Sequence, residues 1–268
     1  MTSAYYELID GLLHPTDLSV GPWTPNVQHG AAVCGAVTRA VEALPTAQPM
    51  DIVRQATDLS RGVPMGPTRV DTRVLREGKR LQVVEADIIV GGEIYARANV
   101  LRMRRSPVID DADRPAPWPG EAEAGARPEV NAHPELWNGP LAMSLQPMWE
   151  RWQPGRGAVW IKMTSELVAG EPLTPPLRAS LSAEMIMTSG HAVSLDRYIV
   201  INADISMSLT RMPIGDDIRV TSTVRLSDDG YGVSEGELYD TTGRFGSGLK
   251  SLLIDRRRPD QPRIDTMN

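Results

Sequence analysis

The two halves of the chain repeat one pattern of strands and turns. Residues 67–104 and 216–255 each show apolar and polar side chains in alternation, interrupted by short turns that contain Gly or Asp. Such runs are typical of β-hairpins. With a shift of 150 positions, Val70, Val74, Glu85, Tyr95, Ala96 and Ala98 coincide with Val220, Val224, Glu235, Phe245, Gly246 and Gly248. A nearly constant offset indicates a duplicated antiparallel meander rather than two unrelated ones.

One helix is expected before the strands of each half. Apolar residues recur at helical spacing in 30–44 and again in 177–190, and the second run ends at a glycine, a common helix terminator. The side chains expected to be buried on these helices are Val33, Val37, Leu181 and Met185. The sequence therefore predicts an α+β fold in which each half is a long helix wrapped by an antiparallel sheet.

Proline divides the chain. Seven of its 22 prolines fall between residues 106 and 140, where no periodic apolar pattern is found. Because proline fixes φ and lacks an N–H donor, this stretch predicts an irregular connector. We expect an N-terminal domain over 1–106, a linker over 107–135, a C-terminal domain over 136–258 and a polar tail over 259–268.

Composition excludes several classes of protein. With 28 Lys and Arg against 34 Asp and Glu, the net charge is −6, which argues against binding to nucleic acid. The apolar runs are too short to span a bilayer, and no signal peptide is recognised, so we expect a cytoplasmic protein. The single cysteine, Cys34, excludes an internal disulfide, and the four histidines lack metal-ligand spacing. Neither a metal nor an organic cofactor is expected.

A helix rich in small residues, entered through His-Gly and followed by a long antiparallel sheet, looks like the hot-dog fold. Two such units in one chain resemble the double hot-dog acyl-CoA thioesterases of the thioesterase II-like superfamily. The segments that carry the resemblance are 22–37, 158–167, 202–220 and 230–248. The resemblance implies a tandem hot-dog fold that cleaves a fatty acyl-CoA or related acyl thioester by attack of water. Since open sheet edges invite pairing, we expect the two sheets to join edge to edge and a homodimer to be the oligomer.

The resemblance assigns the catalytic carboxylate to Asp204. In the family, an Asp on the strand after the second helix helps to activate a water for attack on the thioester, and 202–211 occupies that place here. Alternation also predicts that Asn202, Asp204, Ser206 and Ser208 share one face of the strand. A carboxylate acts as a base towards water only within hydrogen-bond reach of it.

Two further family positions concern the same water. A Ser or Thr near the next hairpin helps to hold it, and Ser222, Thr223 or Ser227 could fill that place. The family also has a Gln on the last strand, where this chain has Lys250. An ammonium group offers only donors, whereas an amide offers a donor and an acceptor, so Lys250 cannot orient water in the same way. A lysine on a terminal strand is more often a solvated charge.

His29 and Gly30 mark the start of the first helix. In hot-dog enzymes, backbone N–H groups at this place polarise the thioester carbonyl, and the positive end of the helix dipole favours an oxyanion. Gly30 has no side chain to obstruct a ligand, and His29 could hydrogen-bond the substrate or simply cap the helix.

Two alternatives to hydrolysis follow. One is a binding protein for acyl thioesters that has lost turnover, which the departure at Lys250 favours. The other is hot-dog hydratase or dehydratase chemistry, which usually needs a His paired with an acidic residue near the helix. His29 has no acidic neighbour in the sequence.

Overall fold

The computed structural model describes residues 4–113, 115–116, 125–132 and 140–258. The predicted polar tail, 259–268, lies outside these residues. Both predicted meanders are present, and each strand of the second starts 149 or 150 positions after its counterpart. They are β4 (Thr68–Glu77), β5 (Leu81–Val90) and β6 (Glu93–Arg104), and β12 (Asp217–Leu226), β13 (Tyr231–Asp240) and β14 (Gly243–Arg256).

The remaining elements of each half place strands before the main helix and at least one strand after it, and the second half has additional short elements. The first half contains β1 (Ala4–Ile9), β2 (Leu12–Pro15), a 3₁₀ turn (Asp17–Ser19), α1 (Gly30–Glu42) and β3 (Met50–Asp58). The second contains α2 (Pro140–Leu145), β7 (Met148–Gln153), β8 (Arg156–Lys162), β9 (Glu166–Val168), α3 (Pro175–Ala183), α4 (Met185–Thr188), β10 (Tyr198–Asn202) and β11 (Asp204–Leu209). A 3₁₀ turn (Asp111–Asp113) lies between the halves.

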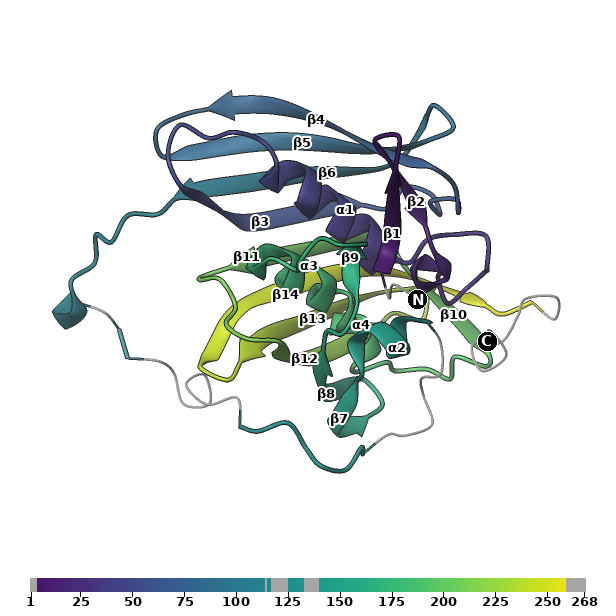
Figure 1. Ribbon diagram of the computed structural model, residues 1–268. Helices are drawn as coiled ribbons and strands as arrows, with labels where there is room; N and C mark the ends of the chain where they lie inside the picture. The colour runs from purple at the N-terminus through teal and green to yellow at the C-terminus, as the bar shows by residue number, and fades with distance from the viewer. Residues whose placement is uncertain (1–3, 114, 117–124, 133–139, 259–268) are drawn as a thin grey trace.

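All these strands form one sheet, and its two halves join where β3 pairs with β11 in antiparallel register, with Thr57 opposite Ile205 and Gln55 opposite Met207. The edge-to-edge junction expected from the sequence is therefore confirmed. The full strand order is β7-β8-β12-β13-β14-β11-β3-β6-β5-β4-β2-β1-β9, and β10 also pairs with β14. Figure 1 shows α1 and α3 between the upper part of this sheet, β3–β6, and its lower part, β11–β14. Among the described residues, no helix is long and apolar enough to cross a membrane.

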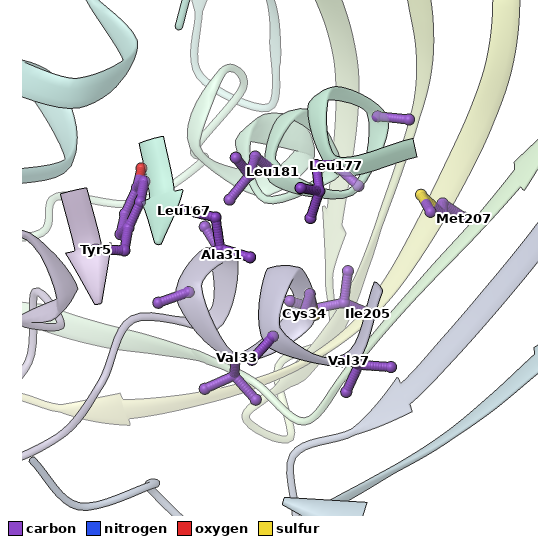
Figure 2. Close-up of a cluster of buried hydrophobic side chains, with 14 of the residues drawn as sticks. Tyr5, Ala31, Val33, Cys34, Val37, Leu167, Leu177, Leu181, Ile205 and Met207 are labelled. Carbon is purple, nitrogen blue, oxygen red and sulfur yellow. The ribbon is translucent and has the colours of Figure 1, made fainter. Parts of the chain in front are cut away.

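The two main helices are buried against each other and against the sheet. Val33 and Val37 of α1 and Leu181 and Met185 of the second helical run are each at most 1% exposed, as predicted. Figure 2 shows Leu177 and Leu181 of α3 facing Ala31 and Cys34 of α1, with Ile205 of β11 beside them. The shared apolar core thus lies where the helices of the two halves meet.

The second helix differs from its prediction in one respect. Instead of one helix over 177–190, α3 ends at Ala183 and a short α4 begins at Met185, with Glu184 between them. The start of α3 is fixed by Thr174, whose side chain accepts a hydrogen bond from Leu177 N, and by prolines in the first turn. The break occurs at the one acidic side chain of the run, which is turned inward.

Glycines allow α4 to lie directly on the sheet. A Cβ atom at Gly248 would come within 2.4 Å of Ile186 Cδ1, and one at Gly157 within 1.7 Å of Ser189 O. A Cβ at Gly246 would come within 2.7 Å of Ser208 O on the neighbouring strand. The backbone therefore packs closely around 246–248, and Gly157 and Gly248 leave room for α4 and the residue that follows it.

Removal of Leu181 should show how much the helix packing contributes. Its side chain is 0% exposed in the shared core, so Leu181→Ala is expected to lower the free energy of unfolding by about 2–5 kcal/mol. Leu253 is 51% exposed, and Leu253→Ala should change the stability by less than about 1 kcal/mol. Chemical denaturation of both variants measures the difference. Equal midpoints for Leu181→Ala and the wild type would contradict the packing described here.

Candidate active site

A buried ion pair lies where the second helical run meets β14. Lys250 is 0% exposed and its Nζ donates to the backbone oxygen of Glu184 at 2.6 Å and to Glu184 Oε2 at 3.0 Å. Burial lowers the pKa of Lys250, and the charge of Glu184 partly offsets this. A buried charge needs such a partner. The expectation that Lys250 is a solvated charge is therefore wrong.

Two more side chains contact the same carboxylate. Asn202 Nδ2 donates to Glu184 Oε1 at 2.8 Å, and His29 Nε2 lies 3.8 Å from that oxygen. His29 comes from the first half of the chain, at the start of α1, whereas the other three residues come from the second half. We call these four residues, His29, Glu184, Asn202 and Lys250, the Glu184 cluster.

The capping hydrogen bond at the start of α1 determines which ring nitrogen of His29 carries the proton. Its Nδ1 accepts a hydrogen bond from the backbone N–H of Ala31 at 3.0 Å. Because Nδ1 accepts this bond it carries no proton, so the ring proton is on Nε2. Burial lowers the pKa of His29, although Glu184 acts in the opposite sense. His29 therefore points a donor towards Glu184 and has no free lone pair to act as a base. The acidic neighbour that a hydratase needs is present in space, but a free base nitrogen is not.

Gly30 lets Glu184 come close to the start of α1. A Cβ atom at this position would lie 3.0 Å from Glu184 Oε2 and 3.1 Å from Ile205 Cδ1. The space that the glycine leaves is thus occupied by the carboxylate and by a core side chain. A negative charge at the amino end of a helix is stabilised by the helix dipole and by the first-turn N–H groups.

Asp204 lies outside the Glu184 cluster. Ala203 and Asp204 together oppose Ser251, whose N–H donates to Asp204 Oδ1 at 2.6 Å and whose oxygen accepts from Ala203 N at 2.9 Å. The extra residue forms a β-bulge, after which the side chains that face the helices and those that face outward are exchanged relative to a regular strand. Asn202 therefore faces the helices, whereas Asp204 pairs with the exposed Asp58 on the outer face. The predicted common face for Asn202 and Asp204 is wrong.

The hydroxyl candidates lie on other parts of the sheet. Ser222 is buried on β12, two strands from Lys250, and its Oγ has no hydrogen-bond partner among the described residues. A Cβ at Gly190 would come within 2.3 Å of that Oγ, so the end of α4 covers it. Thr223 follows on the opposite face, and Ser227 lies in the turn after β12. Of the residues expected at the site, His29, Gly30 and Lys250 converge on Glu184.

A hollow is present on the other side of the sheet. It measures about 920 Å³ and is lined by residues of β7, β8 and β11 to β14, among them Ser206, Thr221, Thr223, Glu237 and Arg244. These side chains alternate with the inward ones that contact the helices. The sheet itself separates this hollow from the Glu184 cluster.

The other helix start has a different set of side chains. Thr174 caps α3 and its hydroxyl donates to Glu42 Oε2 at 2.6 Å. Burial raises the pKa of Glu42, offset in part by Thr174 and Arg102. Arg102 Nη1 donates to Val41 O in the last turn of α1 and to Leu44 O just after the helix. A valine, Val100, occupies the position that corresponds to Lys250. The two ends of the helix pair are therefore chemically unlike.

Glu184 and Asn202 were not found by sequence reasoning. A usable signal existed for Glu184, because it is the one acidic residue within 177–190, a run of small and apolar side chains that the pattern predicts to be buried. A buried acid requires a cation, and the last predicted strand offers two inside its length, Arg244 and Lys250. Asn202 gave no comparable signal.

The fold and this site define a class of protein. The chain superposes on a protein with the hot-dog fold from Alicyclobacillus acidocaldarius with a TM-score of 0.69 and 12% identity, over 96% of this chain and 97% of that one. An acyl-CoA thioesterase II from Mycobacterium marinum superposes with a TM-score of 0.61 and 16% identity over 86% and 91% of the two chains. A tesB protein from Mycobacterium avium subspecies paratuberculosis superposes with a TM-score of 0.62 and 14% identity, over 89% of this chain and 96% of that one. The chain thus has the hot-dog fold.

Sequence models identify the family within this class. Residues 19–103 match the N-terminal domain of acyl-CoA thioesterases and residues 110–252 match their C-terminal domain. The chain belongs to the acyl-CoA thioesterase family. No curated protein sequence matches it. The function expected from the resemblance, hydrolysis of an acyl-CoA thioester, is confirmed at the level of the family.

Proposed function

We propose that the chain hydrolyses a fatty acyl-CoA or related thioester at the Glu184 cluster. The observation that carries the proposal is the Glu184 carboxylate, which is 4% exposed, lies against the start of α1 and is surrounded by hydrogen-bond donors. General base catalysis needs a carboxylate within hydrogen-bond reach of water, and an oxyanion needs N–H groups nearby. Both requirements meet at one place in the fold.

The proposed reaction assigns a step to each group. The water oxygen forms a bond with the thioester carbonyl carbon while one water proton passes to Glu184. The first-turn N–H groups of α1, at Gly30, and the Nε2–H of His29 stabilise the oxyanion. The tetrahedral intermediate then expels the CoA thiolate, the C–S bond breaks, and the proton on Glu184 returns to the sulfur. Lys250 serves as the counter-ion of the Glu184 carboxylate.

The residues expected from the family resemblance stay predictions. Asp204 remains a candidate base, with Ser222 or Thr223 as water ligands, and its carboxylate binds Ser251 N–H on the outer side of the bulge. The geometry favours Glu184 over Asp204 because Glu184 alone faces the start of α1. In this proposal Lys250 is a counter-ion and does not orient the water.

We also propose that the chain is a double hot-dog, with units over 1–106 and 136–258 connected by 107–135. The support is the common order of elements in the two halves and the junction between β3 and β11. The homodimer and the cytoplasmic location expected from the sequence stay predictions.

A panel of acyl-CoA substrates tests the proposed function. We expect steady-state release of free CoA from the purified chain, with a rate that depends on acyl length, detected with a thiol reagent. Binding without release at every length would instead support the acyl-thioester binding protein. A change in enoyl absorbance with 2-enoyl or 3-hydroxyacyl substrates, without release of CoA, would support the hydratase.

A further inference from the structure

The side-chain amide of Asn202 uses its donor but not its acceptor. Its Nδ2 donates to Glu184 Oε1 at 2.8 Å, and this orientation is fixed because a carboxylate can only accept. Its Oδ1 is inaccessible to solvent and has no hydrogen-bond partner within the described part of the chain. An acceptor left in this state costs free energy, so such atoms require an explanation.

The free acceptor is close to the proposed base. The nitrogen and oxygen of one amide are about 2.3 Å apart by covalent geometry, so Oδ1 cannot be far from the carboxylate that Nδ2 contacts. A single water molecule can therefore touch both Asn202 Oδ1 and Glu184. The bulge after β10 creates this arrangement, since it turns Asn202 inward and Asp204 outward.

The other members of the Glu184 cluster cannot supply such an acceptor. Lys250 has donors only, and its Nζ donates hydrogen bonds to the main-chain oxygen and to a side-chain oxygen of Glu184. His29 uses the lone pair of Nδ1 to cap α1 and carries its proton on Nε2. Among the three described side chains of the cluster that contact the carboxylate, Asn202 thus has the one free acceptor, its Oδ1.

We propose that Asn202 positions the nucleophilic water of the hydrolysis. This inference rests on the proposed function. One water proton is donated to Glu184 and transfers to it as the C–O bond forms. The second proton is donated to Asn202 Oδ1 and stays on the attacking oxygen, whose remaining lone pair is directed at the thioester carbonyl carbon. Asn202 is a positioning residue that acts through the water.

The test compares two nucleophiles. Asn202→Ala is expected to lower kcat for hydrolysis by about 10- to 100-fold, the value of one hydrogen bond to a positioned group, with KM within about threefold. Hydroxylamine is nucleophilic without prior deprotonation, so its reaction with the bound acyl group should fall much less. The ratio of hydroxamate to free acid should therefore rise by about tenfold. Asn202→Leu, which retains more of the side-chain volume, provides a second variant if Ala impairs folding.

Ser208→Ala is the matched control, because Ser208 is exposed on the outer face of β11, and its product ratio should equal that of the wild type. A structural role for Asn202 predicts that both nucleophiles slow by the same factor and that the ratio stays constant. That result, or an unchanged kcat, would overturn the inference while leaving CoA release by the wild type intact. Absence of CoA release from the wild type on the whole panel would contradict the proposed function itself and, with it, the role of Asn202.

Discussion

Glu184→Gln is expected to lower kcat for CoA release by about 10²–10⁴-fold, the usual contribution of a general base. The amide has nearly the shape of the carboxylate but cannot take a proton from water. The substitution also leaves Lys250 buried without a counter-charge, which should lower the free energy of unfolding by about 3–5 kcal/mol. The measurements are steady-state kinetics and thermal unfolding.

Two further variants separate catalysis from stability. The double variant Glu184→Gln with Lys250→Met removes both charges, and it should recover much of the lost stability while the activity stays low. Asp204→Asn is the matched comparison, because Asp204 is the base that the family resemblance assigns. A loss of about 10²-fold or more in Asp204→Asn, with Glu184→Gln close to the wild type, would transfer the role of base to Asp204.

Gly157→Ala is expected to destabilise the fold by about 3 kcal/mol or more, a large effect for one methyl group. A Cβ atom here would lie 1.7 Å from the carbonyl oxygen of Ser189 at the end of α4. Gly157 is in β8 between two paired strands, opposite Ser222 on β12 and Trp152 on β7, so neither side can move away easily. Chemical denaturation measures the loss.

Gly78→Ala provides the control for the added methyl group. Its nearest neighbour would be Leu81 O at 3.3 Å, a tight contact that a shift of a few tenths of an ångström relieves in the connection between β4 and β5, so the change in stability should stay within about 1 kcal/mol. If Gly157→Ala unfolds at the same denaturant concentration as Gly78→Ala, the close approach of α4 to β8 is contradicted.

The repeated strands and the buried helix faces could be predicted because they depend on local patterns. Alternation and turn residues fix the meanders, and the spacing of Val33 and Val37 or of Leu181 and Met185 fixes which side of a helix is buried. The start of α1 as part of the site was also predictable, since His29 and Gly30 mark a helix terminus.

The centre of the site could not be predicted, because it depends on packing between segments far apart in the chain. Glu184 contacts a histidine from the other half and a lysine 66 positions later, and no periodicity encodes those contacts. The bulge after β10 is the reason why the predicted position of the catalytic carboxylate differs from the observed cluster. One extra residue, Ala203, exchanges the faces of Asn202 and Asp204, so a strict alternation selected the carboxylate that lies outside the Glu184 cluster.

The junction of β3 with β11 has a consequence for how the molecule tolerates dilution. In an obligate dimer of separate chains, such a junction is lost when the protein concentration falls below the dissociation constant. Here both strands belong to one polypeptide, and each faces the other at an effective concentration set by the connecting chain. His29 and Glu184 come from opposite sides of this junction. Their contact is therefore a property of the single molecule, independent of how many copies surround it.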